Sequence, residues 1–169
     1  WSTSTRNKLQ LGLSLKPTRE EPTINGQTKT WDYYHAQVTN LHHRKRATNC
    51  YAYLDKLVVD GVERQHRRAE LKWRGVLSPA VSIWNSDTPD GNSSREFDAF
   101  IIEEESHRSG NKLIFKSLTD APHFDPAPIC GPAEIEATFI VCSDQFPDAK
   151  EIFRFHYDGN WGVKPLEPS

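Results

Sequence analysis

The sequence predicts an all-β protein, an antiparallel β-sandwich of about eight or nine strands. Apolar side chains recur at every second position in several runs, which is the period of a strand with one buried face. Turn-forming pairs such as Asn25-Gly26 and Asp60-Gly61 separate these runs. No run has the character of a crossover helix, and parallel strands need such crossovers, so we expect antiparallel pairing. A closed β-barrel is the alternative architecture.

The length of 169 residues suits one domain with its own core. Hydrophobic residues make up 36% and charged residues 26%, a balance that fits a globular domain and excludes a disordered chain. We expect the sandwich over residues 8–163, between a linker stub at 1–7 and a tail at 164–169. The net charge of -2 is close to neutral, so overall charge predicts neither a nucleic-acid partner nor a membrane surface.

The start of the chain adds an expectation about its setting. No run reaches the ~18 apolar residues of a membrane span, and no signal peptide opens the sequence. The chain nevertheless begins at Trp1 and contains no methionine. We therefore expect a domain of a larger protein that faces the cytoplasm, either free of the membrane or tethered through a segment upstream of Trp1.

The first predicted strand has leucine at every second position from Leu9 to Leu15 and ends before Pro17, which cannot donate to a sheet. The next patterned stretch runs from Tyr33 to Leu57, where two alternating runs flank a basic segment. We expect these two runs to pair as a β-hairpin. Their apolar faces are formed by Tyr34, Ala36 and Val38 in the first run and by Cys50, Ala52 and Leu54 in the second.

The middle of the chain carries shorter patterns. Ala69, Leu71 and Trp73 alternate with charged residues, which favours a strand, although Glu, Arg and Leu also suit a helix. We expect a short edge strand at 81–84, then a loop at 85–94. The strand expected at 95–102 has an apolar face formed by Phe97, Ala99 and Ile101.

The last third of the chain returns to clear alternation. An apolar run lies at 113–115, and residues 119–134 contain four prolines and read as a long loop. Strands are predicted at 135–142 and around 153–157. Phenylalanine, tyrosine and β-branched residues on one face of each supply the remaining core.

Three cysteines, Cys50, Cys130 and Cys142, make an odd count without short spacing. Cys50 and Cys142 lie in apolar runs, where a reduced thiol behaves as a small hydrophobic side chain. This favours a reducing compartment. The glycosylation pattern at Asn92 points the other way, although one such match in a polar loop arises easily by chance.

A short pattern in the central stretch resembles a known family. Val38-x-Asn40, a loop, and Ala47-x-Asn49-Cys50 resemble prokaryotic immunoglobulin-like domains, including the cell-adhesion-related type and uncharacterised relatives that follow a membrane hairpin. Gly131-Pro132 and the closing run at 158–162 also match that group. The resemblance spans about residues 31–162 and implies an immunoglobulin-like sandwich. The family's usual glycine after Asn40 is replaced here by Leu41, and the resemblance implies no particular activity.

Local catalytic and metal-binding motifs are absent from the sequence: it holds no phosphate-binding glycine loop, HExxH, CxxC or nucleophile elbow. The adjacent His42 and His43 would point apart in a strand, so we read them as loop histidines rather than zinc ligands. Two further histidines each share a strand face with a carboxylate, and surface hydrogen bonds are the ordinary explanation. These pairs are His123 with Asp125 and His156 with Asp158.

Basic residues give the strongest candidate for a binding site. Arg44, Lys45 and Arg46 cap the predicted hairpin, and Arg68, Lys72 and Arg74 would share one solvent face of the following strand region. Guanidinium groups on adjacent strands suit phosphates or carboxylates. Tyr51 and Tyr53, if outward, would add stacking surfaces. The alternative is a solvated face whose charge is balanced by the acidic run at 103–105, which would itself deter edge-to-edge aggregation.

Three functional hypotheses follow. The leading one is a non-enzymatic module that binds a protein or a small anionic ligand, with no cofactor, no metal and no double-stranded nucleic acid as partner. The alternative is a sensor that recognises a nucleotide-like anion through the basic strand face and regulates an attached effector. The third is a hydrolase built on the two histidine–carboxylate pairs, which would have to be assembled from distant loops.

Overall fold

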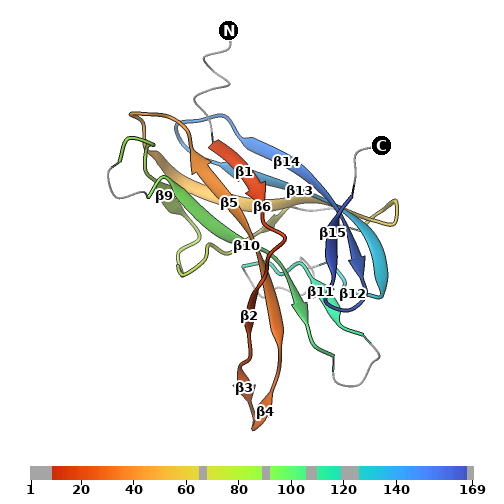
Figure 1. Ribbon diagram of the computed structural model, residues 1–169. Coiled ribbons are helices and arrows are strands. Elements are labelled where there is room, and N and C mark those ends of the chain that lie inside the picture. The colour runs from red at the N-terminus through yellow and green to blue at the C-terminus, as the bar shows by residue number, and fades with distance from the viewer. Residues whose placement is uncertain (1–8, 65–67, 89–91, 106–109, 119–125, 167–169) are drawn as a thin grey trace.

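The computed structural model describes residues 9–64, 68–88, 92–105, 110–118 and 126–166, and these contain strands but no helix. All strand pairs among them are antiparallel. Two sheets stack face to face, and a small hairpin projects from one side (Figure 1). The prediction of an all-β, antiparallel sandwich is confirmed. Within these ranges, no helix has the length and apolar character needed to cross a membrane.

The first sheet is centred on β5, which pairs with β10 on one side and with β1 and β2 on the other. Beyond β10 lie two short strands, β11 and β12. The bounds are β1 Leu9–Leu13, β2 Thr18–Glu20, β5 Trp31–Asn40, β10 Ser94–Glu103, β11 Lys112–Ile114 and β12 Ile129–Cys130.

The second sheet is centred on β13 and β6, with β14 and β15 on one side. On the other edge of β6, three short strands pair with successive parts of this long strand. The bounds are β6 Ala47–Val59, β7 Val62–Glu63, β8 Ala69–Glu70, β9 Val81–Ile83, β13 Pro132–Cys142, β14 Ala149–Asp158 and β15 Val163–Pro165.

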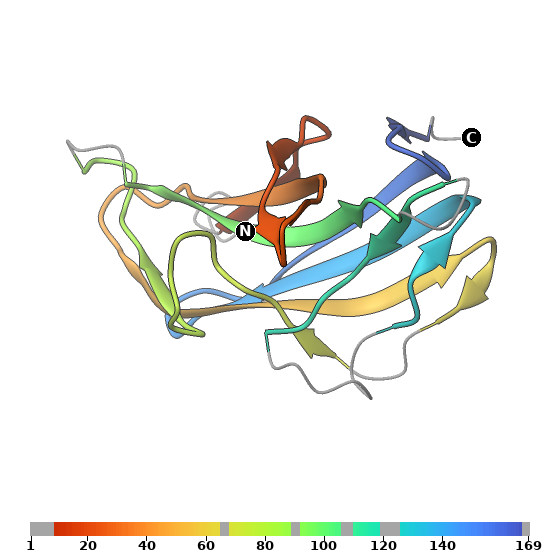
Figure 2. The same cartoon turned by 90° about the horizontal axis from the view of Figure 1, so that it is seen from below.

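The core lies between the two sheets, which Figure 2 shows as two layers joined at one end by the β5–β6 connection. Aromatic rings from both layers meet there. Phe97 of the first sheet packs edge-on against Phe139 of the second at 5.6 Å, and Phe100 stacks on Phe155 at 4.9 Å. All four are almost fully buried. The alternating apolar positions therefore point inward, as predicted for β5, β6, β13 and β14.

The expected hairpin between the two halves of the central stretch is wrong. β5 pairs with β1, β2 and β10, whereas β6 pairs with β13 and with β7, β8 and β9. Residues 41–46 carry the chain from one sheet to the other. The alternation of apolar residues determines which face of each strand is buried. Two such strands bury the same faces whether they pair as a hairpin or lie in different sheets. The pattern alone could not distinguish them.

Residues 69–74 alternate as predicted, but they contact both sheets. Leu71 donates its N–H to the Ala52 carbonyl of β6 at 2.8 Å. Two residues later Trp73 forms a bridge with Phe97 of β10, and its indole N–H donates to the Cys50 carbonyl of β6 at 3.1 Å. Fully buried Trp73 thus ties the two sheets together at their edge.

The face predicted for the strand at 95–102 is correct only for its first half. Between Asp98 and Phe100 the register with β5 shifts, which marks a β-bulge at Ala99. A bulge inserts one residue and reverses the alternation beyond it. Phe100 and Ile102 are therefore buried, whereas Ile101 is only half-buried.

Several boundaries also differ from the expectation. The loop predicted at 119–134 contains β12 and the start of β13, and its residues 119–125 lie outside the described part of the chain, as does the stub at 1–7. The predicted tail includes Lys164 and Pro165 of β15. The Asn25-Gly26 turn is confirmed between β3 (Thr23–Ile24) and β4 (Gln27–Thr28), with φ values of 52° and 78° that suit a type I′ hairpin.

Candidate ligand-binding cleft

A cleft of about 460 Å³ lies on the outer face of the first sheet. Its floor consists of outward-facing residues of β5 and β10, including Tyr33 and His35. Glu20 of β2 stands on one side, and residues 72–75 and 116–118 stand on the other. The site is thus built from strands that are far apart in the sequence and become neighbours only through sheet pairing.

His35 lies on the floor of the cleft and is only 7% exposed. It lies directly opposite Asp98 in the β5–β10 register, and its Nε2 is 3.2 Å from Asp98 Oδ1. Its Nδ1 is 3.8 Å from Glu96 Oε2, so both ring nitrogens face carboxylates. Two carboxylates of the neighbouring strand β10 therefore hold the ring in place.

Tyr33 lies beside His35, with the two rings nearly parallel at 12° and their centroids 6.4 Å apart. Burial raises the pKa of the Tyr33 hydroxyl, and the nearby carboxylates of Glu20 and Asp98 raise it further. The hydroxyl therefore stays protonated at neutral pH and can donate a hydrogen bond. Tyr33 offers a flat apolar surface with a polar group at its tip.

Cations gather on the wall opposite Glu20. Lys72 and Arg74 flank buried Trp73, so both point outward, and Lys116 joins them from the segment after β11. Arg74 pairs with Glu96 at 2.9 Å. Across the described ranges of the chain, Lys72 and Lys116 form no ion pair, and the Lys72 ammonium reaches only the Trp73 carbonyl at 3.4 Å. Two cations thus face the cleft without a counter-ion from the part of the chain that the structure describes.

The structure divides the predicted basic face. Arg68 lies on the second sheet, where its guanidinium stacks over Tyr53 at 5.3 Å and pairs with Asp55 at 3.1 Å. Lys72 and Arg74 line the cleft of the first sheet, because the chain crosses between the sheets at Leu71. The prediction that these three share one face is therefore wrong. The outward position of Tyr51 and Tyr53 is confirmed, with their rings stacked 6.4 Å apart.

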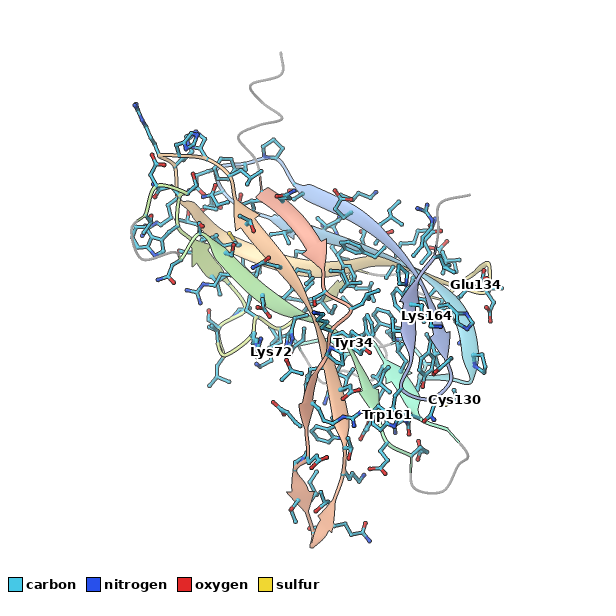
Figure 3. The ribbon with its side chains drawn as sticks, in the orientation of Figure 1. Tyr34, Lys72, Cys130, Glu134, Trp161 and Lys164 are labelled. Atoms are coloured by element: carbon cyan, nitrogen blue, oxygen red, sulfur yellow. The ribbon has the colours of Figure 1, made fainter. Side chains whose placement is uncertain are left out.

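Arg44, Lys45 and Arg46 lie elsewhere, in the exposed β5–β6 connection at one end of the sandwich. Figure 3 shows Lys72 near the middle of the ribbon, well away from that connection at the upper left. The six basic residues of the predicted site therefore belong to three places: the cleft, the outer face of β6, and the end loop.

The predicted histidine–carboxylate pairs do not form a site in the described part of the chain. His123 and Asp125 lie outside the described residues. Asp158 accepts backbone N–H bonds from Asn160 and Gly162 at 2.8 and 2.9 Å, which orders the turn before β15. No group of three or more potential metal ligands gathers among the residues that are described.

Three residues of the cleft, His35, Glu20 and Lys116, were not predicted from the sequence. His35, which follows two tyrosines, is visible in the sequence as an outward position of β5, but its neighbours Asp98 and Glu96 become apparent only once the pairing with β10 is known. The three cysteines are free thiols, and burial raises the pKa of Cys50 to about 12, so its thiol is inert near neutral pH.

Fold and site together define a class: an antiparallel β-sandwich with a polar cleft on its outer face. Comparison of the chain with protein-family models, curated proteins and solved structures finds no match.

Proposed function

We propose that this chain is a non-enzymatic binding module that holds a small anionic ligand in the cleft on its first sheet. The observation that carries the proposal is the convergence of Lys72 and Lys116 on one wall without a counter-ion among the described residues. A carboxylate or phosphate group placed between them would accept charge-assisted hydrogen bonds, which contribute about 1.5–3 kcal/mol each.

The floor of the cleft favours binding over catalysis. A general base needs a nitrogen that can reach the ligand, but the two ring nitrogens of His35 face Asp98 and Glu96. The histidine instead lies between the two carboxylates of β10, and these contacts hold the floor in place. A preorganised floor lowers the entropic cost of binding.

A nucleotide-like ligand is the narrower form of this proposal, and Tyr33 favours it. A planar base could lie on the Tyr33 ring while its phosphate meets the cations on the opposite wall. In this form the module acts as a sensor that regulates an attached effector. Tighter binding of nucleotides than of inorganic phosphate would favour this narrower proposal over the general one of a small anion.

A kinship with prokaryotic immunoglobulin-like domains is a further proposal, supported by the two-sheet architecture. The residues that carry the resemblance have structural roles here. Buried Asn40 binds the β5–β6 connection, and Asn49, at a φ of 51°, donates to Asp144 at 2.6 Å. The kinship would be supported by proteins whose sequences lie between this chain and those domains and which keep asparagine at the positions of Asn40 and Asn49.

Thermal unfolding tests the cleft. A ligand at 100 times its Kd stabilises the folded state by about 2.7 kcal/mol, which raises Tm by roughly 5–10 °C for a domain of this size. We expect such a shift with a member of a panel of phosphates, carboxylates and cyclic nucleotides. Lys72→Ala and Lys116→Ala should each weaken binding roughly 10- to 100-fold.

The matched control is Lys56→Ala, which removes an exposed lysine from the second sheet. It should leave the shift unchanged. The proposal would be contradicted if no anion of the panel raised Tm. It would also be contradicted if the rise in Tm persisted after both Lys72 and Lys116 were replaced.

A further inference from the structure

The β5–β6 connection and the segment after β9 meet at one end of the sandwich, away from the cleft (Figures 1 and 2). This basic end consists of Leu41, Arg44, Lys45, Arg46 and Trp84. Leu41 is 38% exposed and Trp84 is 41% exposed, so both present apolar surface to solvent beside the cations. Cationic and apolar groups are thus presented side by side.

Buried Asn40 fixes the shape of this connection. Its Nδ2 donates to the Lys45 carbonyl at 2.8 Å and to the Ile83 carbonyl at 3.2 Å, and its Oδ1 accepts from the His42 N–H at 2.9 Å. One fully buried side chain therefore binds both ends of the connection and ties it to β9. These bonds anchor the basic segment to the body of the sandwich.

His42 and the segment after β9 complete this framework. The Nδ1 of His42 accepts the backbone N–H groups of Arg44 and Lys45 at 3.0 and 2.9 Å. Asn85 donates to the His43 carbonyl at 2.6 Å, and Ser86 donates its N–H to the His42 carbonyl at 2.9 Å. The connection is therefore preorganised, which reduces the entropy lost when it docks on a partner.

The three cations of the basic end are not neutralised within the described part of the chain: none of them forms an ion pair there. Arg46 lies 4.7 Å above the Trp84 ring, and Lys45 lies 6.0 Å from the Phe146 ring. Among the described residues, the acidic contact of this region is between exposed His43 and Asp87 at 3.2 Å. As far as the described residues go, these guanidinium and ammonium groups are available to an external anion.

We propose that the basic end docks on a membrane surface that contains anionic phospholipids. Lysine and arginine are attracted to anionic headgroups, and tryptophan sits favourably at the headgroup level, where its ring is half in apolar surroundings. Leucine at position 41 would enter the same zone. A nucleic acid would stack a base on the face of Trp84 that Arg46 leaves open, but it would leave exposed Leu41 without an apolar partner.

Vesicle flotation with the full chain tests this docking. We expect binding to vesicles of phosphatidylcholine mixed with phosphatidylserine, little binding to phosphatidylcholine alone, and loss of binding near 1 M salt, where the screening length falls to about 3 Å. The triple variant R44A/K45A/R46A should lower the partition coefficient roughly 100-fold, since each cation near an anionic surface contributes about fivefold. L41S/W84S should lower it as well, at unchanged charge.

The matched control is K56A/K150A/K164A, which removes three exposed lysines from the second sheet. It should bind vesicles nearly as the parent chain does, and melting curves of all variants establish that they fold. The proposal is overturned if no vesicle binds, if the basic-end and control variants bind alike, or if a single-stranded oligonucleotide binds the basic end more tightly than the anionic vesicles do. This test does not involve the cleft, so its outcome is independent of the proposed ligand.

Discussion

The cleft and the basic end both present lysine and arginine to solvent, but different contacts hold them in place. In the cleft, Lys72 and Arg74 are placed by strand register: Asp98 donates its N–H to the Lys72 carbonyl, and Arg74 donates its N–H to the Glu96 carbonyl, both at 2.9 Å. At the basic end, side chains bind the backbone of a connection, with Asn40 at the centre. The cleft therefore depends on the whole sandwich, whereas the basic end depends on a few local bonds.

This difference has a consequence for mutations. A change that disturbs sheet pairing should damage the cleft together with the fold. A change in the local framework should damage the basic end and leave the cleft intact. Three substitutions separate these cases.

The largest effect is expected for Trp73→Ala. The substitution removes a fully buried ring and its hydrogen bond to Cys50, and truncation of a buried aromatic costs about 3–5 kcal/mol of unfolding free energy. Because Trp73 lies between Lys72 and Arg74, ligand binding in the cleft should fall as well. Denaturant unfolding measures the first effect. Trp84→Ala is the control, since its half-exposed ring loses only a surface contact with Arg46, which contributes about 0.5–1 kcal/mol.

An intermediate effect is expected for Asn40→Ala. Its removal leaves the Lys45 and Ile83 carbonyls and the His42 N–H without their side-chain partner, at a cost of about 1–3 kcal/mol. Vesicle binding should weaken because the basic segment loses its fixed shape, while anion binding in the cleft should persist. Gln37→Ala, at an exposed position of the same strand, is the control. Equal losses at both sites would show that the two regions are not independent.

The smallest effect is expected for Arg68→Ala. Arg68 and Asp55 form an exposed pair on the outer face of β6, and such pairs contribute about 0.2–1 kcal/mol. The sequence grouped Arg68 with Lys72 and Arg74, but the structure places it at neither site. Binding to anions and to vesicles should therefore stay within measurement error. A clear loss of anion binding would restore the single basic face that the sequence suggested.

Local patterns predicted much of the fold. Leucines at 9, 11 and 13 form the alternating β1, Asn25-Gly26 forms the type I′ turn, and Phe139 and Phe155 point into the core. Each of these depends on residues within a few positions of one another. The period of two and the backbone preference of Asn-Gly are properties of the chain itself.

The errors arise where distant segments meet. The pairing of β5 with β10, the bulge at Ala99 and the crossing at Leu71 depend on contacts between residues far apart in sequence. The same contacts bring Glu20, Tyr33, His35 and Lys116 to one cleft. A single sequence shows which face of a strand is apolar, but not which strand lies beside it.

The sequence by itself determined that this chain forms strands with one buried face each, because side-chain period and turn chemistry act over short distances. Only the tertiary structure decided which strands are neighbours, and hence that six basic residues divide among three surfaces. Many strand arrangements bury the same apolar faces, and the choice among them rests on long-range packing such as that of Trp73 between the two sheets.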